Sequence, residues 1–294
     1  MILVKLCGGL SNQMFQYAAA RRLAAVHGTS VRIDTRWYDD IPAGATPRVY
    51  ELDKLRITGI RATRWETIGT DGVRNTPPFE RPIALYRKVR PRYRFVGERH
   101  FHFDPQILEL PDNVCLFGYW MSEKYFSDSA DQIRREFRFH SLSSPENEKY
   151  LARMAESASV AIHVRRGDYV SDPNVATIHG VCDVPYYERA IEIVRRHIPD
   201  PQFFVFSDDL DWARDNLPLT DDTEFLGHNR GTHSHEDLRL MMSARHNIIA
   251  NSSFSWWGAW LNANDSKLVV APNKWMNNPS FNARDVLPAD WTRV

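Results

Sequence analysis

Apolar residues recur along this chain in short runs that alternate with segments of helical spacing. Met1–Leu6 reads as a buried strand, and Ser11–His27 carries apolar residues at the intervals typical of a helix. Glycines stand in the Cys7–Gly9 turn between them, and Gly28 ends the helix before a second short strand at Val31–Asp34. This order of strand, glycine turn, helix and strand is the start of an α/β unit.

The same alternation resumes after a Ser- and Pro-rich segment at residues 141–145, the best candidate for a linker. The predicted elements after it, beginning with a helix that runs to about Glu156, are strand Ser159–Val164, helix Pro185–His197, strand Gln202–Phe206, helix Glu236–Ala244, strand Asn247–Ala250, helix Ser255–Leu261 and strand Lys267–Ala271. Earlier in the chain we predict a strand at Val114–Trp120 and a helix at Ser127–Phe137, and we expect short helices and loops in the Pro- and Arg-rich residues 41–100.

Two consecutive α/β runs predict two Rossmann-like domains that face a cleft, with residues 1–145 in the first and 146–294 in the second. A length of 294 residues suits two cores of this size. In such folds ligands bind at the carboxyl ends of the strands.

Charge and cysteine content narrow the class of protein. The formal net charge is +0, so no global field recruits nucleic acid, and any anion site must be local. Three isolated cysteines, the lack of a signal peptide and the lack of an apolar run of about 18 residues favour a cytoplasmic protein. Arg81–Arg94 is locally basic and suits either weak contact with an anionic membrane or a solvated face, which we favour. Nothing in the sequence indicates an oligomeric state.

The first candidate motif, Ala161–Tyr169, follows a predicted strand. Alternation along the strand places His163 and Arg165 on one face, and an arginine fork suits two phosphate oxygens. Arg166 is then expected to pair with Asp168. The alternative is a structural ion pair beside a core histidine.

The second motif, Asn247–Gly258, passes from a buried strand through serines into an apolar helix. Free N–H groups and the helix dipole make such a helix start an anion site. Plain capping of the helix by Ser253 or Ser255 is the compatible alternative. The paired Trp256 and Trp257 are expected in the core.

Acidic residues form the third group of candidates. Ser207, Asp208 and Asp209 end a predicted strand, where they either hold ribose hydroxyls or cap the next helix. Asp209-Leu210-Asp211 is formally a metal-binding Asp-x-Asp, but that pattern is weak, and we predict no metal. Ser234 and Asp237 have capping-box spacing.

Taken together, the segments Gly8–Ala18, His163–Tyr169, Phe206–Asp209 and Asn251–Trp257 resemble the bacterial α-1,2-fucosyltransferases of glycosyltransferase family 11, in order and spacing. One departure is Ser11, where the family usually has glycine. The resemblance implies a GT-B fold, GDP-fucose as donor, a terminal galactoside as acceptor, and inversion at the anomeric carbon without an obligatory metal or a cofactor.

Site residues follow from the same resemblance. In related fucosyltransferases the motif histidine contacts the nucleoside and the arginine the β-phosphate, which implies those roles for His163 and Arg165. Asp237 stands sixteen residues before Ser253, as does the aspartate that reads guanine in the relatives. The implied phosphate donors are the Phe254 N–H and a hydroxyl of Ser252 or Ser253.

The residue that removes the acceptor's proton stays open. Asn12 matches an asparagine that faces the reacting centre in the relatives, while Asp168 and Asp172 are further candidates.

Three other classes compete with this assignment. A transferase with a different sugar nucleotide would use the same architecture. The Trp and Tyr content suits a glycan-binding module, but that module has no use for Arg165 or Asp237. A Rossmann oxidoreductase is disfavoured because the third glycine of the dinucleotide fingerprint is missing after Gly8 and Gly9.

Overall fold

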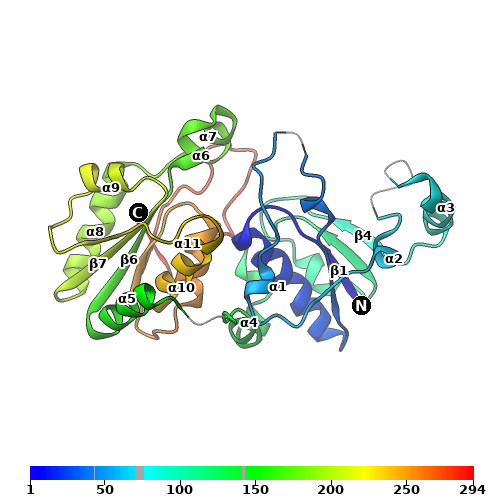
Figure 1. Cartoon of the computed structure of the whole chain (residues 1–294), viewed down its shortest axis with the longest axis horizontal. Helices are drawn as coiled ribbons and strands as arrows, with labels where there is room; N and C mark the ends of the chain where they lie inside the picture. Colours follow the sequence, from blue (N-terminus) through cyan, green and yellow to red (C-terminus); the bar gives the residue numbers. More distant parts are fainter. Residues whose placement is uncertain (43, 71–75, 141–142) are drawn as a thin grey trace. The chain divides into compact units, whose positions relative to one another are not determined.

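The computed structural model describes residues 1–42, 44–70, 76–140 and 143–294 and divides the chain into two units, Met1–His140 and Ser141–Val294 (Figure 1). Each unit contains one parallel sheet with helices around it, so the predicted α/β class is confirmed. The sequence-based boundary at 145/146 falls at the start of α5, Pro145–Glu156. Residues 141 and 142 of the predicted linker lie outside the described part of the chain.

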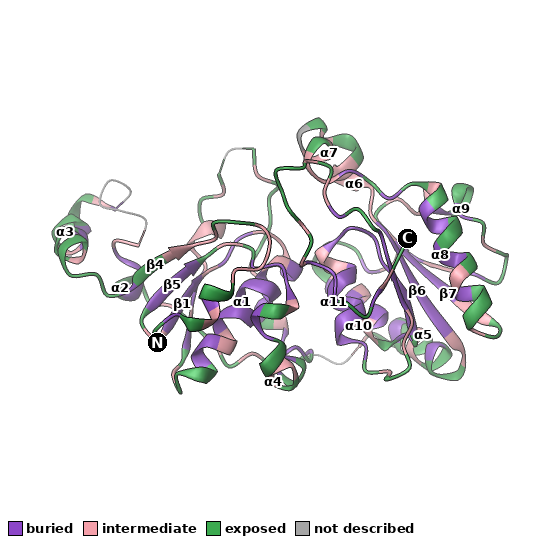
Figure 2. Cartoon of the chain, turned by 180° about the vertical axis from the view of Figure 1, so that it is seen from behind, coloured by how far each residue is buried: buried purple, intermediate pink, exposed green. Residues whose placement is uncertain are grey.

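Unit 1 is built around the central strand β1. Its sheet has the order β3-β2-β1-β5-β4, and all pairs are parallel. Figure 2 shows β1, β5 and the facing side of α1 as buried. The bounds are β1 Ile2–Lys5, α1 Leu10–Val26, β2 Val31–Asp34, β3 Ile60–Arg61, α2 Arg64–Thr67, α3 Arg81–Val89, β4 Arg94–Gly97, β5 Val114–Phe117 and α4 Ala130–Glu136.

Unit 2 is built around β6, Ala158–Val164. This strand and its neighbour β7, Pro201–Ser207, are the longest strands of the sheet, and both are largely buried. The order is β11-β10-β9-β6-β7-β8; counted from β6 as strand 1 and read from β8, this is 3-2-1-4-5-6, the arrangement of dinucleotide-binding domains. The other elements are α6 Gly167–Ser171, α7 Pro173–His179, α8 Val184–His197, α9 Leu210–Asn216, β8 Glu224–Leu226, α10 His235–Ser243, β9 His246–Ile248, α11 Ser253–Leu261, β10 Val269–Ala271 and β11 Thr292–Arg293.

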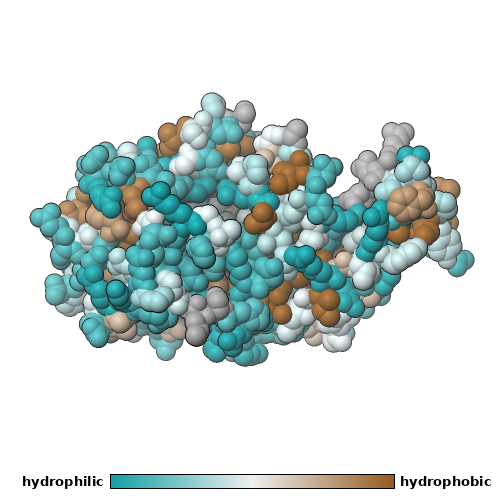
Figure 3. Space-filling view, in the orientation of Figure 1, coloured by the Kyte–Doolittle hydropathy of each residue, from teal (hydrophilic) through white to brown (hydrophobic). Residues whose placement is uncertain are grey.

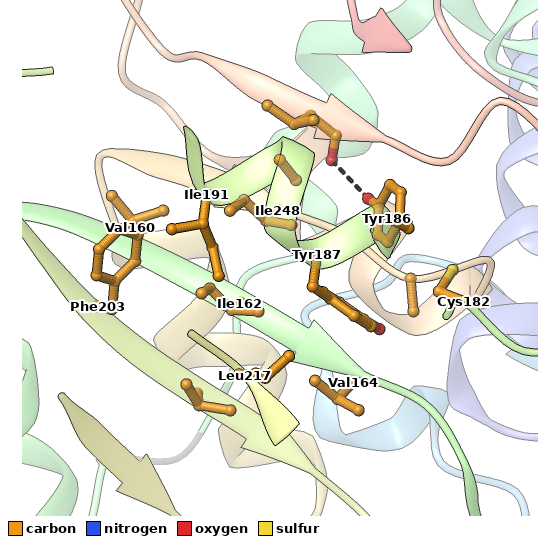
Figure 4. Close-up of a cluster of buried hydrophobic side chains, with 14 of the residues drawn as sticks. Val160, Ile162, Val164, Cys182, Tyr186, Tyr187, Ile191, Phe203, Leu217 and Ile248 are labelled. Carbon is orange, nitrogen blue, oxygen red and sulfur yellow. Dashed lines mark hydrogen bonds between the residues drawn. The ribbon is translucent and has the colours of Figure 1, made fainter. Parts of the chain in front are cut away.

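A buried cluster fixes α8 against one face of this sheet (Figure 4). Asp183 caps the helix by accepting from the Tyr186 N–H at 3.0 Å, and helical spacing then turns Tyr186, Tyr187, Ala190, Ile191 and Val194 inward. The Tyr186 hydroxyl donates to the carbonyl oxygens of Ile249 at 2.5 Å and Val270 at 3.4 Å, and Tyr187 donates to that of His163 at 3.1 Å. The helix is therefore tied to β6 and β10 and to the residue after β9, at or near the carboxyl ends of these strands.

Most predicted helices and strands are present within two or three residues, and the exceptions are short or irregular. Residues 41–100 contain short helices, as expected, but also the strands β3 and β4, which were not predicted. β3 is exposed, and β4 at the sheet edge is exposed at Arg94 and Phe95, half-buried at Val96 and Gly97, and lacks an apolar alternation. The predicted strand Val114–Trp120 ends at Phe117. Trp120 has a φ of 53°, and the Glu98 carboxylate accepts from its backbone N–H at 3.0 Å, so the chain bends away. The short elements α6, α7, α9 and β8 were not predicted.

We predict that Tyr186→Phe lowers the free energy of unfolding by about 1–3 kcal/mol, because the buried Ile249 carbonyl loses its donor while packing is preserved. Urea unfolding followed by tryptophan fluorescence measures the loss. Tyr86→Phe is the matched control, since Tyr86 is 63% exposed; equal stability of the two variants would contradict the prediction.

Candidate functional site

Polar residues gather where the central strands of unit 2 end. Ile162 of β6 pairs with Val205 of β7 on one side and with Ile248 of β9 on the other, so the loops that follow these strands leave the same edge side by side. The connection from β6 runs to β7, whereas the chain crosses back through α10 to reach β9. The edge between β6 and β9 is therefore the topological switch point at which α/β proteins bind ligands.

Arg165 lies at this point and is held by two carboxylates. Its Nη2 donates to Asp168 Oδ1 at 2.5 Å, its Nη1 is 2.7 Å from Asp208 Oδ2, and its guanidinium stacks 5.2 Å from the Tyr169 ring centre. A guanidinium carries five N–H donors, so these two contacts leave donors for a ligand. The side chain is fixed in place before any ligand arrives.

The predicted pair of Arg166 with Asp168 is wrong. Arg166 pairs instead with Asp209 at 3.1 Å and lies over the Trp212 ring at 4.0 Å. The reason is local: α6 begins directly at Gly167, and its first turn places Asp168 three residues after Arg165, at the spacing of an i,i+3 pair.

Asp208 joins the ends of β6 and β7. Its Oδ1 accepts from the Arg166 backbone N–H at 2.8 Å, while Oδ2 contacts Arg165. Gly167 makes this possible, because a Cβ there would lie 2.4 Å from Asp208 Oδ2. The neighbouring Asp209 caps α9 by accepting from the Trp212 N–H at 3.2 Å, and Ser207 Oγ accepts from the Asp209 N–H at 2.9 Å. The capping alternative therefore applies to Asp209.

His163 is buried, with 7% of its surface exposed. Its ring lies 5.9 Å from the ring of Phe254, and its Nδ1 has no hydrogen-bond partner among the described residues. Burial, and then the positive charge of Arg165, lower the pKa of His163 to about 3, so the imidazole is neutral at physiological pH. A neutral ring with one unpartnered nitrogen suits a hydrogen bond to a ligand and does not suit a proton carrier.

The start of α11 follows the end of β9. Its N-cap is Ser252, with φ −133° and ψ 128°, whose Oγ accepts from the Phe254 N–H at 3.3 Å. The expectation that Ser253 or Ser255 caps the helix is wrong, because Ser252 is the last residue in extended conformation. Ser255 Oγ instead donates to the Ser252 carbonyl oxygen at 3.3 Å.

The tandem tryptophans of α11 are core residues, as predicted. Trp256 and Trp257 are both fully buried, at 0% exposure. The Trp256 Nε1–H donates to the Val286 carbonyl oxygen at 2.8 Å. These rings support α11 from the core, and they present no surface to a sugar.

Asn251, immediately before this helix, organises the neighbouring loops and was not singled out from the sequence. Its Nδ2 donates to the carbonyl oxygens of His179 at 3.0 Å, Gly180 at 3.2 Å and Trp275 at 3.3 Å. Its own carbonyl oxygen accepts from the Tyr169 hydroxyl at 3.5 Å. The sequence signal for this residue is an asparagine directly before the two serines that begin a helix. From the sequence, Asn251 is included in that motif but is given no role of its own.

Asp237, on the first turn of α10, is half-buried in a polar network. Asn229 Nδ2 donates to Asp237 Oδ1 at 2.9 Å and to Asn147 Oδ1 at 3.0 Å. Burial raises the pKa of Asp237 to about 7, and the negative charge of Glu236 adds to the rise while the Asn229 hydrogen bond opposes it. The capping box is absent, since Ser234 makes no side-chain cap contact. Asn147 and Asn229 are supporting residues that sequence reasoning missed.

The Asp-x-Asp pair is used otherwise. Asp209 caps α9, and Asp211, with 95% of its side chain exposed, pairs with Arg214 at 3.3 Å. Across the described ranges, no cluster of three or more His, Cys, Asp or Glu side chains is placed to hold a metal ion.

The N-terminal motif belongs to unit 1, after β1. Gly8 has a φ of 76°, and a Cβ there would lie 2.6 Å from Asn12 Nδ2, so this glycine gives room for Asn12. Gln13 donates to the carbonyl oxygens of Gly8 and Val49 at 3.0 and 2.8 Å, and Gln16 accepts from the Cys7 N–H at 3.1 Å. Both glutamines are structural, which leaves Asn12 as the motif's candidate for chemistry.

Comparisons with known proteins bear on this geometry. The sequence model of "Glycosyl transferase family 11" matches residues 93–294. The chain is 32% identical to an Escherichia coli protein named alpha-1,2-colitosyltransferase, over 100% of this chain and 99% of that one. It is 25% identical to the Mus musculus galactoside 2-alpha-L-fucosyltransferase Sec1, over 90% of this chain and 66% of the other.

Among solved structures, a variant of Arabidopsis thaliana FUT1 in complex with GDP matches with a TM-score of 0.50 and 10% identity, covering 92% of this chain and 70% of that one. This likeness concerns the fold. Together with the two parallel sheets it confirms the predicted GT-B-like class.

The raised pKa of Asp237 predicts a pH-dependent stability. Between about pH 4 and pH 7 the folded protein keeps a proton that the unfolded chain releases, so this residue's contribution to the free energy of unfolding falls as pH rises through that window and is flat above it. Asp237→Asn removes the effect. We expect the free energy of unfolding of Asp237→Asn, minus that of the parent, to increase as pH is raised from about 5 to about 8; urea unfolding measures both values.

The exposed Asp211→Asn is the control for removing one negative charge. A difference between Asp237→Asn and the parent that stays constant with pH would contradict the assigned environment of Asp237.

Proposed function

The chain belongs to glycosyl transferase family 11 and is a glycosyltransferase, and from that premise we propose that it transfers L-fucose from GDP-fucose to the 2-hydroxyl of a terminal galactoside. The acceptor is a galactose-terminated glycan. The donor belongs to the unit Ser141–Val294, and the acceptor side to the unit Met1–His140. Free, buried cysteines are compatible with work in the cytoplasm, where the sugar nucleotide is available.

The observation that carries this proposal is the fixed guanidinium of Arg165 at the switch point of the unit 2 sheet. Asp168 and Asp208 set its orientation, and its remaining N–H donors suit the oxygens of a diphosphate. The start of α11 follows the adjacent strand and adds backbone N–H groups and a positive dipole end. The Phe254 N–H, now bonded to Ser252 Oγ, and the hydroxyls of Ser252 and Ser253 are the proposed phosphate donors.

The nucleoside contacts are those that the family resemblance implies, and burial and charge support them. The unpartnered Nδ1 of His163 suits a hydroxyl or ring nitrogen of the nucleoside. Asp237 suits the guanine edge, whose ring N–H and amine both donate to one carboxylate; these donors would favour the ionised form and lower the pKa of Asp237 on binding. Ser207 and Asp208 complete the donor side, with Asp208 acting chiefly by holding Arg165.

The proposed reaction is an inverting displacement. The acceptor 2-hydroxyl oxygen forms a bond to the anomeric carbon, the bond from that carbon to the β-phosphate oxygen breaks, and GDP leaves with one more negative charge. Arg165 and the helix start stabilise this growing charge, which is the contribution that preorganised donors make best. We assign no obligatory metal to the step.

The hydroxyl proton leaves the acceptor as the new bond forms. Asn12, Asp168 and Asp172 remain the candidate groups for this proton transfer. Because Asp168 is bonded to Arg165 in the structure, we propose that it serves first to position that side chain. Burial lowers the pKa of His163, which makes its imidazole a weak base for this step.

A second donor is favoured by one relative. The protein named alpha-1,2-colitosyltransferase matches the whole of this chain. Colitose is fucose without its 3-hydroxyl, and both are activated as GDP sugars, so the guanosine diphosphate contacts would be common to the two donors. The pocket around the 3-position decides between them.

We predict that Arg165→Lys lowers kcat by about 10²–10³-fold while the fold survives, because lysine keeps the charge but loses the oriented fork. Arg166→Lys is the matched control; its guanidinium engages Asp209 and Trp212, so a much smaller loss is expected. Equal losses for the two variants would contradict the assignment of the phosphate contact to Arg165.

A donor panel tests the function itself. We expect transfer from GDP-fucose to a terminal galactoside, with weaker or no turnover of GDP-mannose and UDP-galactose, and activity that persists in EDTA. Preference for GDP-colitose would establish the second donor. Binding of a glycan without any dependence on a nucleotide sugar, or activity that requires added manganese, would overturn the proposal.

A further inference from the structure

We propose that α3 of unit 1 is a docking surface for anionic lipid membranes, which holds the enzyme at a membrane surface. Among the described residues, no helix is long and apolar enough to cross a bilayer. Contact with a membrane would therefore be peripheral, through a surface that is both apolar and basic. The segment Phe79–Arg94 has both properties.

The helix is turned so that apolar residues face outward. Ala84 is 1% exposed and marks the inner side, where Arg87 donates to the Ile68 carbonyl oxygen at 2.9 Å. The outer side carries Leu85, Tyr86 and Val89, at 57%, 63% and 79% exposure, at the i, i+1 and i+4 spacing of one helical face. Phe79, just before the helix, is 74% exposed. Figure 3 shows hydrophobic surface in the region of α3.

The charge around this stripe has one sign. No Asp or Glu occurs between Glu80 and Glu98, whereas the same stretch contains Arg81, Arg87, Lys88, Arg90, Arg92 and Arg94. Three of these arginines have partners: Arg87 the Ile68 carbonyl, Arg81 the Thr76 carbonyl at 3.3 Å, and Arg92 the Glu66 carboxylate. Lys88, Arg90 and Arg94 extend from exposed positions. In a protein of formal net charge +0, this is a local concentration of positive charge.

An anionic membrane surface complements both features at once. Apolar side chains of an interfacial helix enter the boundary between headgroups and acyl chains, and flanking Lys and Arg contact the lipid phosphates. From the sequence alone we favour a solvated face for Arg81–Arg94. The weak periodicity of this segment does not predict that Leu85, Tyr86 and Val89 are exposed on one side of a helix. A purely solvated face has no need of exposed large apolar residues on the same helix.

Vesicle flotation of the full chain tests the proposal. We expect binding to vesicles of phosphatidylglycerol and phosphatidylethanolamine, little binding to phosphatidylcholine, and release between ~0.1 M and ~1 M salt. Each basic residue near an anionic surface contributes about fivefold to binding. The double variant Lys88→Glu, Arg90→Glu should therefore weaken binding by about 25-fold or more. Leu85→Ser with Val89→Ser should weaken it about tenfold or more.

Matched controls separate this surface from general charge and hydrophobicity. Arg134→Glu with Arg135→Glu reverses two exposed charges on α4, and Val26→Ser with Val49→Ser removes two exposed apolar side chains elsewhere in unit 1; both should bind like the parent. Transfer to a soluble acceptor should be unchanged in every variant, which separates this test from that of the proposed function. No binding to anionic vesicles, equal loss in the control variants, or vesicle-independent self-association abolished by the α3 variants would overturn the proposal.

Discussion

The contact on which the site depends is the pair of carboxylates around Arg165. Asp208 reaches from the end of β7 to the Arg165 guanidinium and to the Arg166 backbone N–H, and Asp168 closes the other side from the first turn of α6. Two strand ends and one helix are thereby locked to a single side chain. Because two carboxylates surround one guanidinium, net positive charge does not explain anion recognition here, and the proposal depends on the fixed direction of the remaining N–H donors.

Secondary structure and core could be predicted where the sequence pattern is long. The sequence pattern predicts burial correctly in three elements: the apolar strand β6, the inward face of α8 and the tryptophans of α11. The two-residue β3 and the exposed β4 could not be predicted, because an edge strand with arginines has no apolar period. Arg165 and His163 could be proposed as candidates, since Arg165 directly follows the buried strand β6 and His163 is the residue before its last.

The partners of these residues could not be predicted from sequence. Strand alternation suggested that Arg166 pairs with Asp168, but the chain becomes helical at Gly167 and brings Asp168 to Arg165 instead. Asn229 lies in an unpatterned loop and donates to the Asp237 carboxyl, and Asn147, far away along the chain, accepts from the same Asn229 amide. Such contacts depend on how distant segments come together in the fold. The positions of hydrogen-bonding side chains along the chain follow no regular spacing that would predict them.

The central place of β6 in its sheet also governs when the site can exist during synthesis. Its neighbours are β7 on one side and β9 on the other, and the helix start that completes the edge comes only at Ser253. A ribosome therefore releases Arg165 long before the segments that shape its surroundings, and parallel pairing across such separations is slow. The nascent chain gains the full set of these groups only after Ser253 has been synthesised, so a ligand that needs all of them can stabilise the protein only from that point on.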